Sequence, residues 1–304
     1  MRGWIIYKVK ESELTEEHYE TRRFLEEAEK AGIEISVYRP EQIDIIVTSE
    51  GRQSIFVDDK EAALPDFVLP RMGAGTSYFA LAVIRHLERQ GVFSVNSSVS
   101  IETVRDKLYT HQILAESKLP VPKTMLLKFP VDYEHIKKHM GFPMIIKTLS
   151  GSLGRGVFLA ENMTMFENIA RIVEIANPNM NIILQEMIMT SYGKDLRIFV
   201  VGGRVVGSML REARDSDYRA NYSAGGRVSY FELTEEIEWL ALEATRILGL
   251  DVAGVDLLFH KEGFMVCEVN SSPMFRGMES CNDVNIPQEI YKYIKFRLNK
   301  PGDK

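Results

Sequence analysis

The stretch Val255-Asp-Leu-Leu-Phe-His-Lys-Glu-Gly-Phe-Met-Val-Cys-Glu-Val-Asn270 contains two apolar runs separated by turn-forming residues. This pattern predicts a β-hairpin. Asp256 lies in the first run, and Glu268 and Asn270 lie in the second, so the folded hairpin would bring three oxygen ligands close together. Such ligands suit Mg²⁺ that is shared with phosphate oxygens. The alternative is a pair of solvated acids on an edge hairpin.

A second hairpin is expected around the apolar strand Pro143-Met-Ile-Ile-Lys147. The glycine-rich segment Gly151-Ser-Leu-Gly154-Arg-Gly156 follows it, and another apolar run begins at Val157. Glycines let backbone N–H groups approach phosphate oxygens, and Lys147 would add a positive charge. The segment is not a Walker A loop, because the pattern G-x-x-x-x-G-K-[ST] is absent. Alone it would be read as an ordinary flexible hairpin, but the acidic hairpin downstream favours phosphate binding.

Together with several shorter motifs, these two hairpins resemble the ATP-grasp ligases, and within that superfamily the RimK-like glutamate ligases. The similarity covers roughly residues 67–298. Besides the two hairpins, the motifs that carry it are Leu69-Pro-Arg-Met-Gly73, Arg105-Asp-Lys-Leu108, Gln185-Glu186, Asp195-Leu-Arg197, Asp217-Tyr-Arg-Ala-Asn221, Gly225-Gly226, Asp251-Val-Ala-Gly-Val-Asp256 and Glu268-Val-Asn-Ser-Ser-Pro273.

The predicted fold class is mixed α/β and α+β, arranged as an ATP-grasp fold in three parts. Alternating strand and helix patterns over residues 1–98 predict an N-terminal parallel-sheet (pre-ATP-grasp) domain. Residues 99–188 are expected to form the central subdomain with the glycine-rich lid. They begin with one amphipathic helix over Val99–Ser117, which Leu119-Pro-Val-Pro122 ends. Residues 189–304 are expected to form the C-terminal catalytic subdomain with the metal site.

The resemblance also implies how ATP would be held. Lys107 and Lys147 would clamp the polyphosphate from two sides. The backbone of the segment Gln185-Glu-Met-Ile188 would hold adenine, and Asp195 would bond the ribose hydroxyls. The full ATP-binding set is Lys107, Lys147, Gly151, Gly154, Gly156, Gln185, Glu186, Met187, Ile188, Asp195, Arg219 and Asn221. For Met187 and Ile188, packing in the core is the alternative reading.

Charge near the γ-phosphate would be neutralised by the catalytic residues Arg211, Arg219 and Asn221, because phosphoryl transfer depends mainly on positioning and electrostatics. A merely solvated loop over residues 215–226 is the alternative for the last two. Arg71 follows an expected strand at the edge of the first sheet, where its forked guanidinium would suit a substrate carboxylate. The substrate residues implied are therefore Arg71 and Arg211.

The implied activity is that of an ATP-dependent carbon–nitrogen (acid–amino-acid) ligase. It would work through an acylphosphate, with Mg²⁺ (two ions, or Mn²⁺ instead) held by Asp256, Glu268 and Asn270. L-Glutamate is the expected amine, and the C-terminus of a protein, peptide or glutamate chain is the expected acceptor. Relatives often have basic residues before the paired glycines, whereas this chain has Ser223-Ala224. A carrier protein, a coenzyme or a precursor peptide therefore stays open as acceptor. A kinase and a non-catalytic nucleotide-binding regulator are the rival interpretations.

Composition and charge argue against several other classes of protein. A net charge of −6 argues against a general nucleic-acid binder, and no apolar stretch has the length of a membrane helix. Two cysteines and no leader-like N-terminus predict a cytoplasmic protein without a disulfide scaffold. His135 and His139 have helical zinc-ligand spacing, but no third ligand is evident. Family precedent favours a homotetramer.

Overall fold

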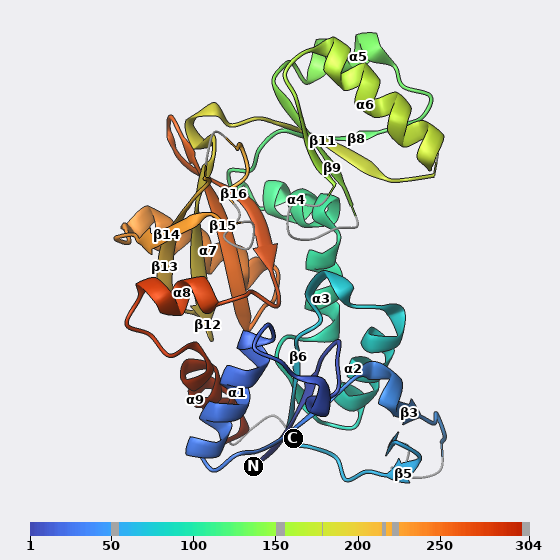
Figure 1. Cartoon of the computed structure of the whole chain (residues 1–304), viewed down its shortest axis with the longest axis vertical. Helices are drawn as coiled ribbons and strands as arrows, with labels where there is room; N and C mark the ends of the chain where they lie inside the picture. Colours follow the sequence, from blue (N-terminus) through green and yellow to red (C-terminus); the bar gives the residue numbers. More distant parts are fainter. Residues whose placement is uncertain (50–54, 150–155, 178, 215–216, 221–224, 300–304) are drawn as a thin grey trace.

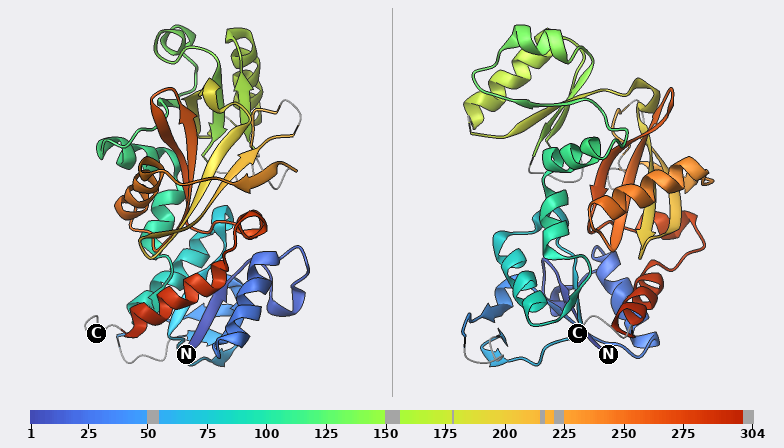
Figure 2. Two further views of the ribbon diagram at one scale, coloured as in Figure 1. Left: turned by 90° about the vertical axis from the view of Figure 1, so that its left-hand side faces the viewer. Right: turned by 180° about the vertical axis from the view of Figure 1, so that it is seen from behind.

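The computed structural model describes residues 1–49, 55–149, 156–177, 179–214, 217–220 and 225–299. Three sheet-containing parts follow one another along the long axis of the molecule (Figure 1). The N-terminal domain lies at one end and the central subdomain at the other, with the five-stranded C-terminal sheet between them (Figure 2). Within the described part of the chain, no helix is long and apolar enough to cross a membrane.

The N-terminal domain is built on a parallel sheet, as the alternating pattern predicts. Its strands follow the order β2-β1-β6-β7. The elements are β1 (Arg2–Ile6), α1 (Tyr19–Lys30), β2 (Glu34–Tyr38), β6 (Phe67–Pro70), α2 (Tyr78–Arg89) and β7 (Phe93–Ser94). A small antiparallel sheet joins β3 (Ile43–Ile45), β4 (Ile55–Val57) and β5 (Lys60–Glu61). Short 3₁₀ helices span Glu11–Glu13, Pro40–Gln42, Gly73–Gly75 and, later in the chain, Met189–Ser191.

The single helix predicted over Val99–Ser117 is in fact two helices, α3 (Ser98–Arg105) and α4 (Lys107–Glu116). Asp106 separates them in an extended conformation, and its carboxylate accepts a hydrogen bond from the backbone N–H of Tyr109 at 3.0 Å. An aspartate that caps a new helix competes with continuation of the old one. The break places Lys107 in the first turn of α4, at the wall of the central cavity.

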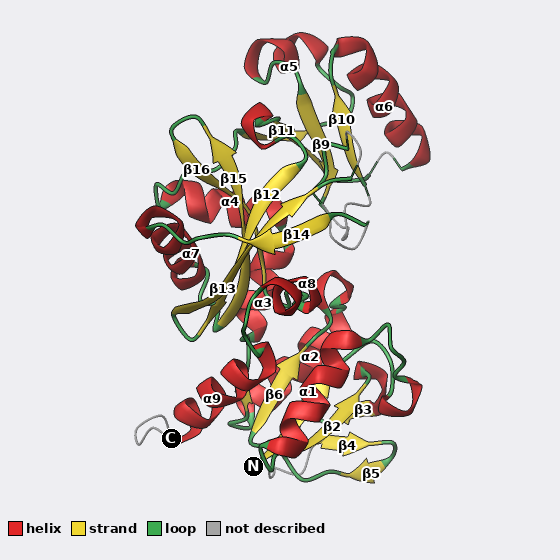
Figure 3. Ribbon diagram, turned by 60° about the vertical axis from the view of Figure 1, so that its left-hand side comes forward, coloured by secondary structure: helices red, strands yellow, loops and turns green. Residues whose placement is uncertain are grey.

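The central subdomain is an antiparallel sheet with helices on one face. The strands β8 (Thr124–Leu127), β9 (Met144–Thr148), β10 (Val157–Ala160) and β11 (Ile182–Glu186) have the order β10-β9-β11-β8. Helices α5 (Tyr133–His139) and α6 (Met163–Ala176) cover one face, where Phe166, Ile146 and Leu184 form a core (Figure 3). Because side chains alternate along a strand, Lys147 and Gln185 lie on the opposite face.

The C-terminal subdomain contains the predicted acidic hairpin. Its antiparallel sheet has the order β14-β13-β12-β15-β16. The elements are β12 (Lys194–Val201), β13 (Arg204–Glu212), β14 (Arg227–Tyr230), α7 (Glu235–Ile247), β15 (Val252–His260), β16 (Gly263–Asn270), α8 (Arg276–Cys281) and α9 (Ile286–Asn299). Helix α9 returns to the N-terminal domain and packs against α1, where the Tyr291 hydroxyl donates to the Phe24 carbonyl at 2.9 Å.

Asn96 joins the N-terminal domain to the sheet of the C-terminal subdomain. Its side-chain oxygen accepts hydrogen bonds from the backbone N–H groups of Asp251 (2.6 Å) and Val252 (2.8 Å). Its Nδ2 donates to the carbonyls of Val252 (2.7 Å) and Ser271 (2.8 Å). The side chain is buried, so these four bonds satisfy an amide that would otherwise be costly to bury. Asn96 therefore fixes the start of β15 and the segment that follows β16.

Candidate active site

One cavity of about 1940 Å³ lies between the three parts and collects most of the predicted site residues. Those that line it are Arg71, Lys107, Lys147, Gln185, Glu186, Met187, Ile188, Asp195, Arg211, Arg219, Asp256, Glu268 and Asn270. Gly151, Gly154 and Asn221 lie outside the described residues. Gly156 is described and has φ +76°, and a Cβ there would lie 2.5 Å from the Thr148 hydroxyl oxygen, so only glycine fits.

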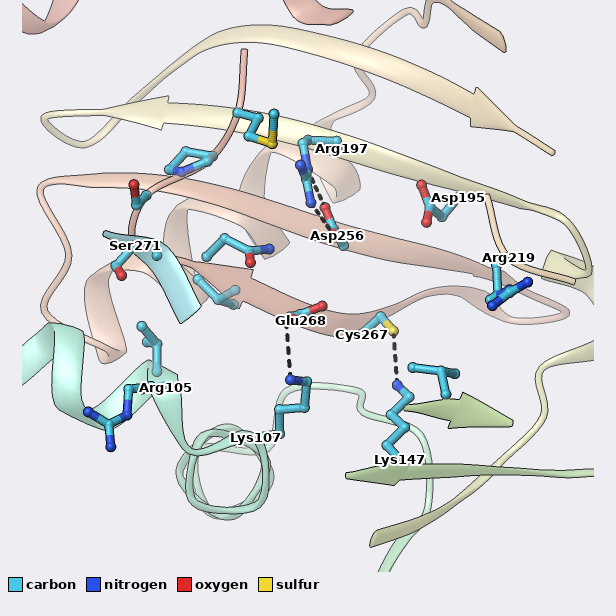
Figure 4. Close-up of a pocket in the computed structure, with 18 of the residues that line it drawn as sticks. Arg105, Lys107, Lys147, Asp195, Arg197, Arg219, Asp256, Cys267, Glu268 and Ser271 are labelled. Carbon is cyan, nitrogen blue, oxygen red and sulfur yellow. Dashed lines mark hydrogen bonds and ion pairs between the residues drawn. The ribbon is translucent and has the colours of Figure 1, made fainter. Parts of the chain in front are cut away.

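The acidic hairpin has the expected pairing. Asp256 on β15 lies directly opposite Glu268 on β16, and Asn270 lies opposite Gly254. Directly paired residues of an antiparallel ladder share a face, so both carboxylates point into the cavity (Figure 4). The Nδ2 atom of Asn270 is buried and has no hydrogen-bond partner among the described residues.

These three residues fit a magnesium site completed by a ligand. The described residues contain no group of three His, Cys, Asp or Glu side chains that could hold a metal by themselves. Two carboxylates and an amide leave several coordination positions for phosphate oxygens and water, as Mg²⁺ prefers. The unpartnered amide of Asn270 agrees with this, because rotation of the amide would present its oxygen to a cation.

A buried network of alternating charges lies behind Asp256. Arg197 contacts both Asp256 oxygens at 2.7 Å, and Arg211 Nη2 reaches Asp256 Oδ2 at 2.9 Å. Arg211 also forms two bonds to Asp195, at 2.6 and 2.8 Å. The register of the sheet creates this network, since Asp195 pairs with Arg211 and Arg197 pairs with Asp256. Arg197 was not among the predicted site residues, although its position two residues after Asp195 placed it on the same face of the strand.

The pKa values of the two buried acids of this network are shifted in opposite directions. Burial raises the pKa of Asp195 above its ordinary value; Arg211 opposes this effect and Asp256 adds to it. Burial also disfavours the charged form of Asp256, but Arg197 and Arg211 outweigh it and hold the pKa of Asp256 below its usual range. Asp256 is therefore ionised in this arrangement, as a metal ligand must be. The expected contact of Asp195 with ribose stays a prediction, and in this structure its carboxylate pairs with Arg211.

Both predicted lysines point at β16, but from different elements (Figure 4). Lys107 on α4 places its Nζ 3.9 Å from Glu268 Oε1. Lys147 on β9 places its Nζ 3.8 Å from Cys267 Sγ and 2.5 Å from Gln185 Oε1. Two ammonium groups thus face the acidic hairpin across the cavity. A polyphosphate between them could bind both lysines and, through a cation, the two carboxylates.

A β-bulge shapes this part of β16. Asp256 pairs with Glu268 but Leu257 pairs with Val266, so Cys267 is an extra residue in the ladder. Bulges redirect side chains and free backbone groups next to functional sites. Here Cys267 and Glu268 both line the cavity, and the Cys267 carbonyl lies 3.0 Å from His111 Nε2. Neither the bulge nor the contact of His111 with β16 was predicted from the sequence.

The segment expected to hold adenine forms hydrogen bonds within the protein. Gln185 is 2% exposed, and its side chain lies between Lys147 and Thr124. Glu186 Oε1 accepts a bond from the Lys123 backbone N–H at 2.7 Å, and the Met187 N–H donates to the Pro143 carbonyl at 3.3 Å. Adenine binding by this segment stays a prediction.

Two arginines have environments that differ from each other. Arg71 donates to the Pro273 carbonyl at 2.8 Å, and its guanidinium lies 5.5 Å from the centre of the Phe24 ring. Burial lowers its pKa, and no carboxylate among the described residues lies within ion-pair distance of it. Arg219 instead pairs with Asp217 of its own segment, at 3.0 Å, and is partly exposed. A catalytic role for Arg219 stays a prediction.

Two family models match consecutive parts of the chain. The RimK PreATP-grasp domain matches residues 13–101, and the RimK-like ATP-grasp domain matches residues 104–294. A probable alpha-L-glutamate ligase of Rhodopirellula baltica is 39% identical over 284 residues, which cover 93% of this chain and 69% of that protein. A protein of the same name from Methanococcoides burtonii is 38% identical over 91% of each chain.

Solved structures show the same fold at low identity. The ATP-grasp ligase PsnB complexed with a minimal precursor superimposes with a TM-score of 0.73 at 21% identity, covering 97% of this chain and 98% of PsnB. D-Alanine–D-alanine ligase from Bacillus anthracis superimposes with a TM-score of 0.67 at 17% identity, over 99% of this chain and 100% of that one. The ATP-grasp architecture expected from sequence is therefore confirmed.

Proposed function

Because the chain belongs to the RimK-like family of ATP-grasp ligases, we propose that it joins the amine of L-glutamate to a carboxylate acceptor at the expense of ATP. The observation that carries this proposal is the convergence of Lys107, Lys147 and the Asp256–Glu268 pair on one cavity. The name shared by the relatives, probable alpha-L-glutamate ligase, supports glutamate as the amine.

ATP and Mg²⁺ are the cofactors used by this family, and the residues at the cavity suit both. We place Mg²⁺ on Asp256, Glu268 and Asn270, with two ions as the proposed number and Mn²⁺ as a substitute. Bound there, the metal would neutralise the charge on the phosphates and on the leaving group. The lysines would hold phosphate oxygens from the opposite side, and the backbone of residues 185–188 would hold adenine.

The proposed reaction has two steps in the same cavity. An acceptor carboxylate oxygen attacks the γ-phosphorus of ATP, giving an acylphosphate and ADP. The glutamate amine then attacks the acyl carbon and displaces phosphate, losing its proton and forming an amide. Arg211 is positioned among the charged groups of the site, where it would neutralise charge that develops in both steps. An enzyme nucleophile is not required by this sequence of steps.

Arg71 is the proposed contact for a substrate carboxylate. Arg71 is partly buried, and Glu20, the acid that most favours its charged form, makes no ion pair with it, so a carboxylate from a ligand would offset the cost of burial. Its bond to the Pro273 carbonyl fixes the guanidinium beside the segment that follows the metal ligands. Planar guanidinium groups hold carboxylates in two-point contacts, which gives orientation as well as affinity.

The acceptor is proposed only as a class, a carboxylate at the end of a protein, a peptide or a glutamate chain. The cavity of about 1940 Å³ exceeds the usual small-ligand pocket of about 300–1,000 Å³, so it leaves room for an acceptor beside ATP. A precursor peptide is the second candidate, because PsnB, which shares the fold, has been solved with one.

The test is a phosphate-release screen that pairs amino acids with peptide, polyglutamate and small-molecule carboxylates in the presence of ATP and Mg²⁺. We expect ADP and phosphate to appear together only with a competent pair, and mass spectrometry to show one or more added glutamyl units. A phosphorylated acceptor without free phosphate would identify a kinase. Tight ATP binding without ADP release across the whole panel would identify a regulator. Light scattering in the same preparation would test the proposed homotetramer.

A further inference from the structure

A row of polar side chains crosses the cavity-facing side of the central sheet and ends at Lys147. Thr124 on β8 lies directly opposite Gln185 on β11. Lys147 on β9 lies opposite Ile183, two residues before Gln185, so Lys147 and Gln185 are diagonal neighbours on the same face. Long side chains can meet across such a diagonal. The register of three strands therefore sets up the row.

The row is joined by hydrogen bonds from one end to the other. Lys147 Nζ donates to Gln185 Oε1 at 2.5 Å, and Gln185 Nε2 donates to Thr124 Oγ1 at 3.1 Å. Thr124 Oγ1 lies 3.3 Å from His111 Nδ1 and 2.9 Å from the Pro122 carbonyl. His111 Nε2 lies 3.0 Å from the Cys267 carbonyl. Each of these polar groups thus has a partner inside the protein.

The partners determine the direction of the bonds that His111 Nε2 and the Gln185 amide make. A carbonyl oxygen can only accept, so His111 must carry a proton on Nε2 to bond Cys267. The Thr124 hydroxyl has a single proton and two acceptors beside it, the Pro122 carbonyl at 2.9 Å and, when the ring is neutral, His111 Nδ1 at 3.3 Å. Burial lowers the pKa of His111, which favours the neutral ring. The Gln185 amide is also oriented, because its oxygen faces an ammonium group and its nitrogen faces a hydroxyl.

The row is anchored outside the central sheet, at the bulge of β16. His111 belongs to α4 and bonds the Cys267 carbonyl, and the Val266 N–H donates to the Pro120 carbonyl at 2.8 Å. Backbone groups at the bulge therefore attach both α4 and the segment that leads into β8. Glu268, the proposed metal ligand, follows Cys267 directly. The position of Lys147 is thereby tied to the position of the acidic hairpin.

We propose that Gln185, Thr124 and His111 are positioning residues that hold the Lys147 ammonium group where it meets the phosphates of a nucleotide. This inference rests on the proposed function, because it assumes that a nucleotide occupies the cavity. The proposal gives the Gln185 side chain a role in positioning Lys147. This role differs from the adenine contact, which is expected for the backbone of residues 185–188. Lysine has a flexible four-carbon stem, so an unsupported ammonium would have to be ordered by the ligand itself.

The test compares ligands with and without phosphates. Gln185→Met removes both amide bonds at similar length, and Thr124→Val removes the hydroxyl that orients the amide, whereas Thr124→Ser keeps it. We expect Gln185→Met and Thr124→Val to weaken Mg-ADP binding about tenfold, which corresponds to about 1.4 kcal/mol, in calorimetric titrations. Adenosine, measured by its displacement of ADP, should bind these variants as it binds the wild type. Thr124→Ser should restore most of the ADP affinity.

A matched control is Thr245→Val, which removes another buried hydroxyl that bonds a carbonyl, at 2.7 Å within α7 and away from the cavity lining. It should leave both affinities unchanged. Equal losses for adenosine and ADP would overturn the proposal, because they would place Gln185 at the adenine. Unchanged ADP binding in both folded variants would also overturn it. Wild-type protein that binds neither ligand would contradict the proposed function itself.

Discussion

Arg197 and Asp256 face each other across β12 and β15 and form a two-pronged ion pair, with Nε–Oδ1 and Nη2–Oδ2 distances of 2.7 Å. Asp256 is also one of the proposed metal ligands. A single buried carboxylate therefore forms ion pairs with two arginines and would also bind a cation. A carboxylate has enough lone pairs for such sharing. The arginines keep Asp256 charged and oriented before any ligand arrives.

Arg197→Met should lower the free energy of unfolding by about 3 kcal/mol, because it leaves Asp256 buried with a single cationic partner. Urea denaturation followed by circular dichroism would measure the loss. Arg246→Met, which breaks an exposed pair with Glu243, is the control and should change stability little. Equal stability of the Arg197 variant and the control would mean that the network does not hold Asp256.

Glu268→Ala should reduce substrate-dependent ADP release by about 10²–10³-fold, a loss typical of removing one charge-stabilising group from an active site. The melting temperature should change little, because Glu268 lies in the cavity wall and not in the core. Glu262→Ala removes an exposed acid from the turn of the same hairpin and serves as the control. Undiminished turnover in the Glu268 variant would overturn the metal assignment.

Asn96→Ala should destabilise the protein by at least 2 kcal/mol, on the order of the cost of two buried backbone N–H groups left without acceptors. The groups concerned are those of Asp251 and Val252. Asn168→Ala, on the exposed side of α6, is a suitable comparison. Chemical denaturation could place both variants within about 0.5 kcal/mol of the wild type. The contact of Asn96 with the C-terminal sheet would then not contribute to stability.

Glu27 should make stability depend on acid pH. A hydrogen bond from Lys30 is the main cause that lowers the pKa of Glu27 from 4.5 to about 2; burial opposes the shift and Arg23 adds to it. Because the folded pKa lies below the unfolded one, the stabilising effect is complete above about pH 4.5. It is lost as the pH falls towards 2.

The difference in melting temperature between the wild type and Glu27→Gln should therefore be largest near pH 6 and should shrink by pH 3. Glu29→Gln changes an exposed acid on the same helix and should show no such trend. A difference that stays constant from pH 6 to pH 3 would contradict the linkage between Glu27 and folding.

The local patterns in the sequence predicted the elements that carry the site. Two apolar runs separated by turn-forming residues identified the hairpin that carries Asp256 and Glu268, and the structure pairs the two acids directly. A lysine at the end of an apolar strand identified Lys147. The helix break at Asp106 was missed because an aspartate inside an amphipathic pattern is compatible with either a continuous helix or a cap, and packing decides between them.

Contacts across long sequence separations could not be predicted in this way. Arg197 meets Asp256 only because β12 and β15 are neighbours in a particular register. His111 looked like an ordinary helical residue, since its partners Thr124 and Cys267 lie on two different sheets. The extra residue at Cys267 has no local signature, because either register would keep apolar residues on the buried face.

That extra residue has a consequence for how such enzymes can vary. Val266 and Leu257 keep their places in the core, and Glu268 and Asp256 keep theirs in the cavity, so the insertion at Cys267 leaves both faces of the hairpin undisturbed. A lineage could thus gain or lose one amino acid at this point and change the contact between the Cys267 carbonyl and His111, while both faces of the hairpin keep their side chains.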